Sequence, residues 1–291
     1  MPQVTMRDGR VLDVQVEGPD DGHVAVFFHG TPGSRVPPRD LVRSAIRHGL
    51  RFVTWSRPGF GGSSRLRGRR IVDVVADTED VLAHLGVDEC VVGGGSGGGP
   101  HALACGARLD AARAVLCNAC VAPFDAEGLD FLGGMGKGNH DELDAILAGE
   151  DTLRTYLEAA VADMGDVTVD DVLRSLSTVL PPVDRAVITA ELAEDMVASR
   201  REAIRTGVDG WLDDDLAFVT DWGFELDEIE VPVTLWQGSE DLMVPFTHGQ
   251  WLAERIPDVH AHLEQGEGHM SIGVGHVDEM LDELVELAGW E

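Results

Sequence analysis

The chain has 291 residues, of which 44% are hydrophobic and 25% are charged, and its formal net charge at pH 7 is −30. This composition is that of a globular protein, and no apolar run approaches the roughly 18 residues of a membrane span, so a membrane partner is excluded. An acidic chain repels polyanions, and no basic stripe with interleaved aromatic residues occurs, which excludes nucleic acid as a partner.

The beginning of the chain and its cysteine content bear on localisation. The first residues, MPQVTMRDGR, lack the basic segment, apolar core and small-residue cleavage site of a secretory signal, and the four cysteines do not suggest a disulfide framework. We therefore expect a cytoplasmic protein. Lys137 is the only lysine among 22 basic residues. Adaptation to high salt and GC-rich codon usage both produce that pattern, and both remain open.

Short apolar runs alternate with stretches of helical spacing along the first 123 residues. The runs are residues 24–28, 52–55, 90–92 and 114–117, and the helical stretches are residues 39–48, 71–85 and 100–109. A repeated strand-then-helix pattern predicts an α/β fold with a mostly parallel sheet that helices cover on both faces.

This rhythm is interrupted after Pro123. Residues 124–222 are rich in Ala, Leu, Asp and Glu at helical spacing, and the alternation resumes with a strand at 233–236, a helix at 246–255, a strand at 261–263 and a final helix to Leu287. We therefore expect a core of residues 1–123 and 223–291 with a helical cap at 124–222. The acidic run 213–215 is interpreted as a helix start or a solvated face. Apolar residues available to line a cavity under the cap are Phe131, Leu132, Trp211, Phe218 and Trp222.

The stretch GGGSGGG at residues 93–99 follows the strand at 90–92 directly. A flexible linker would separate two self-sufficient halves, whereas these glycines join a strand to a helix within one alternating pattern, which favours a tight turn. Residues 94–98 fit G-x-S-x-G in the strand–turn–helix context of a nucleophile elbow, with Ser96 as the nucleophile. Gly94 and Gly98 supply the small residues that the crowded turn needs, and the N–H of Gly97 would face an oxyanion at the positive end of the helix.

A serine nucleophile needs a base, and the base needs an acid that orients it. Asp241 and His269 each follow a predicted strand, and the order Ser, Asp, His is the one expected on such a sheet. Both loops leave the carboxyl ends of predicted parallel strands, where Ser96 also lies, so the three side chains could converge. Glu240 remains an alternative to Asp241 as the acid.

With these motifs the chain resembles the α/β-hydrolase superfamily over nearly its whole length. The matching segments are HGTPG at 29–33, RPGFGGS at 57–63, the Ser96 turn, the Asp241 loop and the Gly268-His269 pair. The resemblance implies an α/β-hydrolase fold with a cap over the site, and Ser96 as nucleophile, His269 as general base and then acid, and Asp241 as the orienting carboxylate. It further implies an oxyanion hole formed by the N–H groups of Thr31 and Gly97. His29 and Gly30 are expected to support the loop that carries Thr31.

The chain departs from the superfamily pattern at two positions. Gly95 stands before the serine, where such enzymes often carry His or another larger side chain, and this leaves the place empty. The loop before Pro58 often carries an acidic residue, and Ser56-Arg57 stands there instead. The second change alters packing beneath the site but removes no catalytic group.

The leading hypothesis is a serine hydrolase that acts on a small, mainly apolar carboxylic ester, with no metal or organic cofactor. A proline iminopeptidase-like amide hydrolase is the runner-up, because the 29–33 loop resembles that of those enzymes, although Thr31 stands where they commonly carry glycine. A carbon–carbon bond hydrolase or lactonase, and a non-catalytic hydrolase-like binding protein, also remain. The expected partner is a small-molecule substrate, and monomer and homodimer are both open.

Two other groups of residues have alternative readings. His260 and His262, two apart on a strand, would face the same side and could in principle bind a metal with His269. Exposed strand histidines are commoner, so we expect no metal site. Cys117 and Cys120 have redox spacing, but they end a strand instead of opening a helix, which favours buried free thiols.

Overall fold

A computed structural model describes residues 3–164 and 167–290 of the chain. Over these residues the chain forms one eight-stranded sheet with the strand order β1-β2-β4-β3-β5-β6-β7-β8. β2 pairs antiparallel with both β1 and β4, and every other neighbouring pair is parallel. The strands are β1 (Gln3–Thr5), β2 (Val11–Glu17), β3 (His23–Phe28), β4 (Leu50–Trp55), β5 (Cys90–Gly95), β6 (Ala112–Asn118), β7 (Val233–Gly238) and β8 (Val259–Glu264).

The apolar runs of the sequence are the parallel strands β3 to β8, which confirms the predicted mostly parallel sheet. Their central members are buried because helices cover both faces. β1 and β2 were not expected from the sequence. In β2, with the sequence VLDVQVE, Leu12 and Val14 are buried two residues apart. The polar residues of this segment weaken the alternating apolar pattern by which a strand is predicted.

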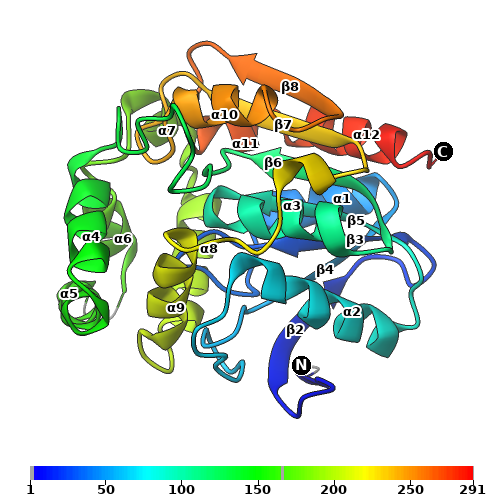
Figure 1. Cartoon of the computed structure of the whole chain (residues 1–291), viewed down its shortest axis with the longest axis horizontal. Coiled ribbons are helices and arrows are strands. Elements are labelled where there is room, and N and C mark those ends of the chain that lie inside the picture. Colours follow the sequence, from blue (N-terminus) through cyan, green and yellow to red (C-terminus); the bar gives the residue numbers. More distant parts are fainter. Residues whose placement is uncertain (1–2, 165–166, 291) are drawn as a thin grey trace.

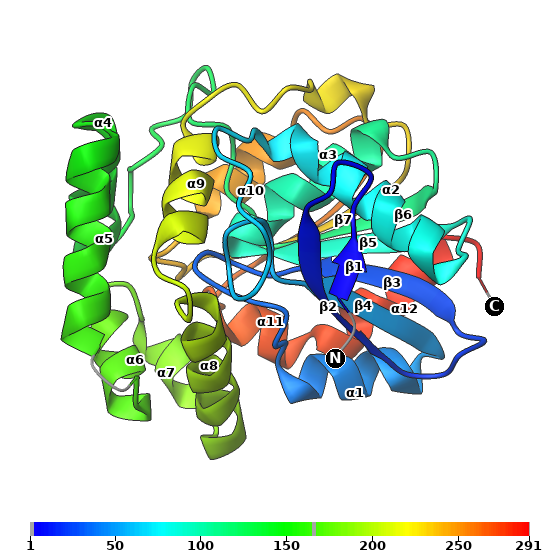
Figure 2. The ribbon, with the colours of Figure 1, turned by 90° about the horizontal axis from the view of Figure 1, so that it is seen from below.

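Helices pack on the two faces of the sheet, as Figure 2 shows. One face is covered by α1 (Arg39–Arg47), α11 (Ser271–Gly275) and α12 (Val277–Leu287), and the other by α2 (Val74–Leu85), α3 (Gly99–Arg108) and α10 (Phe246–Ala253). Each face has its own apolar cluster: Leu281 and Leu284 of α12 belong to the first, and Leu103 of α3 and Leu252 of α10 to the second. The doubly covered sheet is the α/β architecture expected from the sequence.

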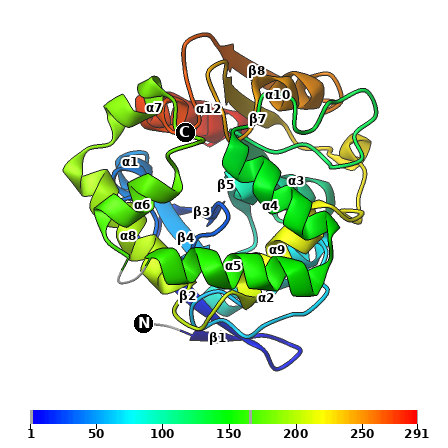
Figure 3. The ribbon, with the colours of Figure 1, turned by 90° about the vertical axis from the view of Figure 1, so that its left-hand side faces the viewer.

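The residues between β6 and β7 form a helical insertion. Its helices are α4 (Lys137–Leu147), α5 (Glu150–Met164), α6 (Val169–Ser175), α7 (Pro182–Val187), α8 (Ala190–Ala203) and α9 (Asp209–Phe218). They bury a third apolar cluster around Leu153, Leu157 and Leu212. α7 packs on α11 and α8 on α1, so the inserted helices lie across the carboxyl ends of the strands (Figures 1 and 3).

None of the helices in the described ranges is long and apolar enough to cross a bilayer.

Candidate active site

The turn around Ser96 has the geometry that the glycine pattern predicts. β5 ends at Gly95, a 3₁₀ turn covers Ser96–Gly98, and α3 follows. Ser96 has a φ of 55°, a left-handed conformation that side chains rarely adopt. A Cβ on Gly94 would overlap the carbonyl of Gly98, and a Cβ on Gly98 would overlap the carbonyls that end β3. The crowding confirms why both flanking positions are glycine.

Asp241, and not Glu240, is the acid that meets His269. Nδ1 of His269 lies 2.7 Å from Oδ2 of Asp241, whose side chain is fully buried. The backbone N–H groups of Met243 and Val244 each donate to Oδ1 of Asp241 at 2.8 Å, and Nε2 of Gln237 donates to Oδ2 at 3.0 Å. The carboxylate therefore has a fixed orientation, with one oxygen aimed at the imidazole.

His269 is a histidine whose charged form the site favours. Burial on its own would lower the pKa of His269, but the charge and the hydrogen bond of Asp241 outweigh it, so the pKa is raised above its ordinary value of 6.5. Ser96 and His269 line the same cavity, which has a volume of about 480 Å³. No hydrogen bond joins them in the described part of the chain. In enzymes, hydrogen bonds of this kind often tighten only when substrate binds.

The loop after β3 lies against the Ser96 turn. A Cβ on Gly97 would lie 2.6 Å from Oγ1 of Thr31, and a Cβ on Gly30 would lie 3.4 Å from Cβ of Ser96. The two backbone segments expected to form the oxyanion hole are therefore neighbours beside Ser96. His29 donates from Nδ1 to the carbonyl of Gly30 at 2.7 Å, because its Nε2 accepts from the N–H of Arg57 at 3.1 Å. Burial lowers the pKa of His29 well below 6.5, so it braces this loop as a neutral ring.

The acidic run Asp213–Asp215 is buried, so its interpretation as a helix start or solvated face is wrong. The three carboxylates lie inside α9, with exposed fractions of 3%, 0% and 4%. Asp214 pairs with Arg57 and Arg69 at 2.6 Å each and accepts a hydrogen bond from Oγ1 of Thr31 at 2.7 Å. Burial would raise the pKa of Asp214, but the two guanidinium groups outweigh it and the net shift is downward, which keeps Asp214 ionised.

This network explains the unusual Ser56-Arg57 pair. Nη1 and Nη2 of Arg57 donate to the carbonyls of His29 and Gly30, while its Nη2 also donates to Asp214. Arg57 therefore holds the loop that carries Thr31, and the inserted helix α9 supplies the countercharge. The acid that balances this arginine lies 157 residues further along the chain, so local sequence could not reveal it.

Asp184 of α7 is a second acid of the inserted helices that holds a site loop. Its side chain is fully buried, and it accepts hydrogen bonds from the backbone N–H groups of His269, Met270 and Ser271 at 2.9–3.0 Å. A Cβ on Gly268 would overlap this carboxylate, which explains the glycine before His269. Asp184 is not among the residues predicted from the sequence, where its only signal is an acidic residue in a short Pro-initiated helix.

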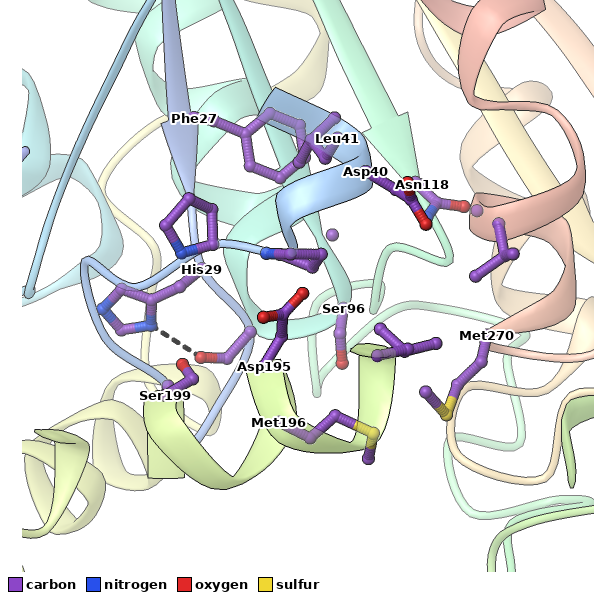
Figure 4. Close-up of a pocket in the computed structure, with 18 of the residues that line it drawn as sticks. Phe27, His29, Asp40, Leu41, Ser96, Asn118, Asp195, Met196, Ser199 and Met270 are labelled. Carbon is purple, nitrogen blue, oxygen red and sulfur yellow. Dashed lines mark hydrogen bonds between the residues drawn. The ribbon is translucent and has the colours of Figure 1, made fainter. Parts of the chain in front are cut away.

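The surface of the cavity beside Ser96 is mainly apolar, with aliphatic and methionine side chains, and Arg47, Asp195 and Arg200 also line it. From the inserted helices, Val172 of α6, Val187 of α7 and Met196 of α8 contribute, and Met270 also lines the cavity (Figure 4). None of the five residues proposed from the sequence is found among the described lining residues. Phe131, Leu132, Trp211, Phe218 and Trp222 pack elsewhere, although Phe218 approaches the back of Gly97.

The other candidate groups lie away from the cavity. His260 and His262 both pair with Glu283 of α12, at 3.4 and 2.8 Å, and His262 stacks on Trp236. Within residues 3–164 and 167–290 no cluster of three His, Cys, Asp or Glu side chains could hold a metal ion. The four cysteines are free and buried, Cys117 and Cys120 included, as the sequence predicts.

Comparison with known proteins decides the family. The model of the alpha/beta hydrolase fold family matches residues 24–275. The chain belongs to the α/β-hydrolase family. This hydrolase is 27% identical over 252 residues to a bifunctional esterase/perhydrolase of Acinetobacter calcoaceticus, with 84% of each chain covered. It is also 35% identical over 100 residues to a proline iminopeptidase of Arabidopsis thaliana, a match that covers 33% of this chain and only 26% of that relative.

Solved structures show the same fold. A hydrolase from Pseudomonas aeruginosa PA01 superimposes with a TM-score of 0.70 at 16% identity, covering 99% of this chain and 98% of that one. The esterase RhEst1 from Rhodococcus sp. ECU1013 superimposes with a TM-score of 0.69 at 18% identity, with 98% of both chains covered. The α/β-hydrolase fold expected from the sequence motifs is therefore confirmed for this hydrolase.

Proposed function

We propose that this hydrolase is a serine carboxylesterase that uses Ser96, His269 and Asp241 and acts on small, apolar esters. One observation carries the proposal: Ser96, in its strained turn, and His269, which is hydrogen-bonded to Asp241, line the same mainly apolar cavity. The inserted helices act as a cap, because α6 to α8 provide one wall of that cavity.

The reaction follows from the roles of these groups. His269 takes the proton of the Ser96 hydroxyl as Oγ attacks the ester carbonyl, and the N–H groups of Thr31 and Gly97 receive the oxyanion. The imidazolium, stabilised by Asp241, then protonates the leaving alcohol as the C–O bond breaks. Water attacks the acyl-enzyme with His269 as base, and collapse of the second tetrahedral intermediate returns the proton to Ser96 and releases the acid.

An ester fits the cavity better than the substrate of an iminopeptidase. An aminopeptidase must bind a substrate ammonium, which calls for an unpaired carboxylate near the nucleophile. Of the described lining residues, the acidic ones are Asp40 and Asp195, and arginines already pair with both. The relative aligned over 84% of the chain is also described as an esterase, whereas the iminopeptidase match is local.

The test is labelling with a fluorophosphonate, read by intact mass, on wild type and Ser96→Ala. We expect one adduct on wild type and none on the variant, together with hydrolysis of p-nitrophenyl acetate that Ser96→Ala abolishes. Folded wild type that takes no adduct and hydrolyses neither esters nor aminoacyl amides would contradict the proposal and favour the binding-protein alternative. Hydrolysis of prolyl amides in preference to esters would favour the iminopeptidase alternative.

A further inference from the structure

Alternate residues of β5 face the side of the sheet that α1 and α12 cover. Val91 belongs to the apolar cluster on that side, and side chains alternate along a strand, so positions 93 and 95 face the same way. Both are glycines. The ring of Phe27 from β3 occupies the place beside Gly93, where a Cβ would lie 2.7 Å from it. Among the described residues, no atom comes that close to a Cβ built on Gly95.

Gly95 differs in this respect from the other glycines of the cluster. A Cβ would clash at Gly93, Gly94, Gly97 and Gly98, so packing requires glycine there. At Gly95 the nearest atoms would be 3.8 and 3.9 Å away, and both belong to Asn118. The backbone at Gly95 has φ −110° and ψ 144°, a β conformation that any residue adopts. Neither packing nor backbone geometry accounts for a glycine at this position.

The space beside Gly95 is part of the cavity that Ser96 lines. From Gly95 the cavity runs between the sheet and the helices α1 and α12, and we call this part the sheet arm. Its apolar side chains come from β3, α1, β6 and α12: Phe27, Leu41, Leu116, Val277, Met280 and Leu281. Thr54 of β4 and Arg47 of α1 also line the cavity. Phe27 lies on a central strand under helices and is nevertheless only partly buried, because the cavity reaches it. Figure 4 shows Phe27 and Leu41 together on this side of Ser96.

One polar side chain lies at the start of the sheet arm. Asn118 pairs with Gly95 across β5 and β6, and its Oδ1 has no hydrogen-bond partner in the described residues. The amide adjoins Gly95, next to Ser96 and close to where an ester group would lie, and the walls further along the sheet arm are mainly apolar. The sheet arm therefore suits a chain that is polar at the ester and aliphatic beyond it.

We propose that the sheet arm binds an aliphatic chain of the ester, and that the missing side chain at Gly95 sets the chain length that the enzyme accepts. This inference rests on the proposed esterase function. A bound chain gains about fourfold in affinity for each methylene removed from water, so activity should rise with chain length until the sheet arm is full. A side chain at position 95 closes the sheet arm at its entrance.

The test compares Gly95→Val with wild type. Valine suits the β conformation at this position, and its branched side chain would occupy the entrance. We expect the ratio of kcat/KM for p-nitrophenyl octanoate to that for p-nitrophenyl acetate to fall by roughly tenfold or more, the equivalent of losing two methylenes or more. Gly275→Val is the matched control, since Gly275 is exposed, has open space around it and does not line the cavity. Its ratio should stay within about twofold of wild type.

Two substrate series identify which chain the sheet arm holds. A loss confined to p-nitrophenyl esters of increasing acyl length assigns it to the acyl chain, and a loss confined to alkyl acetates of increasing alcohol length assigns it to the alcohol. If Gly95→Val changes neither series by more than about twofold while thermal unfolding shows a folded protein, the inference is wrong. Leu281→Ala, which enlarges the sheet arm, should shift the preferred length upward in the same series.

A binding measurement separates this inference from the proposed function. In the Ser96→Ala background, 1-octanol binding is measured by calorimetry with and without Gly95→Val. Weaker binding by roughly tenfold supports the sheet arm even if wild type hydrolyses no ester, a result that would overturn only the proposed function. Equal octanol binding by the two proteins, or none by either, overturns the sheet arm, whatever the activity of wild type.

Discussion

Asp214→Asn should destabilise the protein far more than a change from acid to amide on the same helix normally does. The carboxylate of Asp214 is fully buried, and its partners Arg57 and Arg69 have exposed side-chain fractions of only 1% and 3%. Neutralising Asp214 leaves two buried guanidinium groups without their countercharge. Breaking a buried ion pair in this way costs about 3–5 kcal/mol of unfolding free energy.

Asp209→Asn is the matched control on α9. The side chain of Asp209 is 41% exposed and pairs with Arg65 and Arg154 at 2.9 and 2.8 Å. Exposed pairs of this kind contribute about 0–1 kcal/mol. Urea unfolding of wild type and the two variants, followed by circular dichroism, gives the comparison. If Asp214→Asn lowers the unfolding free energy by no more than Asp209→Asn does, the buried ion pairs of Asp214 do not stabilise the protein as described.

The Asp214 network also predicts a kinetic effect. Asp214 accepts the hydrogen bond from the Thr31 hydroxyl, and Thr31 carries one of the two proposed oxyanion donors. Loss of an oxyanion donor costs about 10²–10³ in kcat, and a loosened loop should cost a part of that. We expect kcat for p-nitrophenyl acetate to fall by roughly tenfold in Asp214→Asn at a temperature where the variant is fully folded, with a smaller change in KM. An unchanged kcat would mean that the Asp214 network contributes to the stability of the protein and not to catalysis.

Three further predictions follow from the site. Because the imidazolium form of His269 accepts no proton, kcat/KM should fall as the pH drops through the raised pKa of His269. In a pH–rate profile, Asp241→Asn should move this acidic fall in kcat/KM to lower pH and reduce kcat by about 10⁴. Asp184→Ala leaves three backbone N–H groups without their acceptor, so the unfolding free energy should fall by about 1–3 kcal/mol and kcat should fall with it. If urea unfolding and kinetic assays give the variant the same unfolding free energy and kcat as wild type, the role assigned to Asp184 is contradicted. Burial and the charge of Glu142 raise the pKa of Asp215 well above 3.8, so the native state keeps a proton that the unfolded chain loses. The free energy of unfolding should therefore decline as the pH rises from about 4 through the raised pKa of Asp215. Thermal unfolding measured against pH should show that Asp215→Asn flattens this decline.

The local patterns of the sequence carry most of the fold and the identity of the candidate triad. Buried parallel strands read as continuous apolar runs, so residues 24–28 and 90–92 predicted β3 and β5 directly. The glycines around Ser96 could be interpreted because the turn is made within five consecutive residues, and the steric need for small side chains acts locally. Asp241 could not be separated from Glu240, because the choice depends on which carboxylate points toward a loop 28 residues away.

Contacts between distant segments decided the rest. Asp184 and Asp214 hold the loops of His269 and Thr31 from 85 and 183 residues away, and no local pattern distinguishes them from solvated acids such as Asp209. The five large apolar residues of the insertion were plausible cavity residues by composition, yet they do not line the cavity. Charge and hydrophobicity are properties of a residue, whereas the cost of burying a carboxylate and the direction of a side chain depend on its neighbours. For that reason the sequence alone determined the order of strands and helices and the glycine turn around Ser96. The roles of the buried acids and the empty place beside Gly95 were visible only in the tertiary structure.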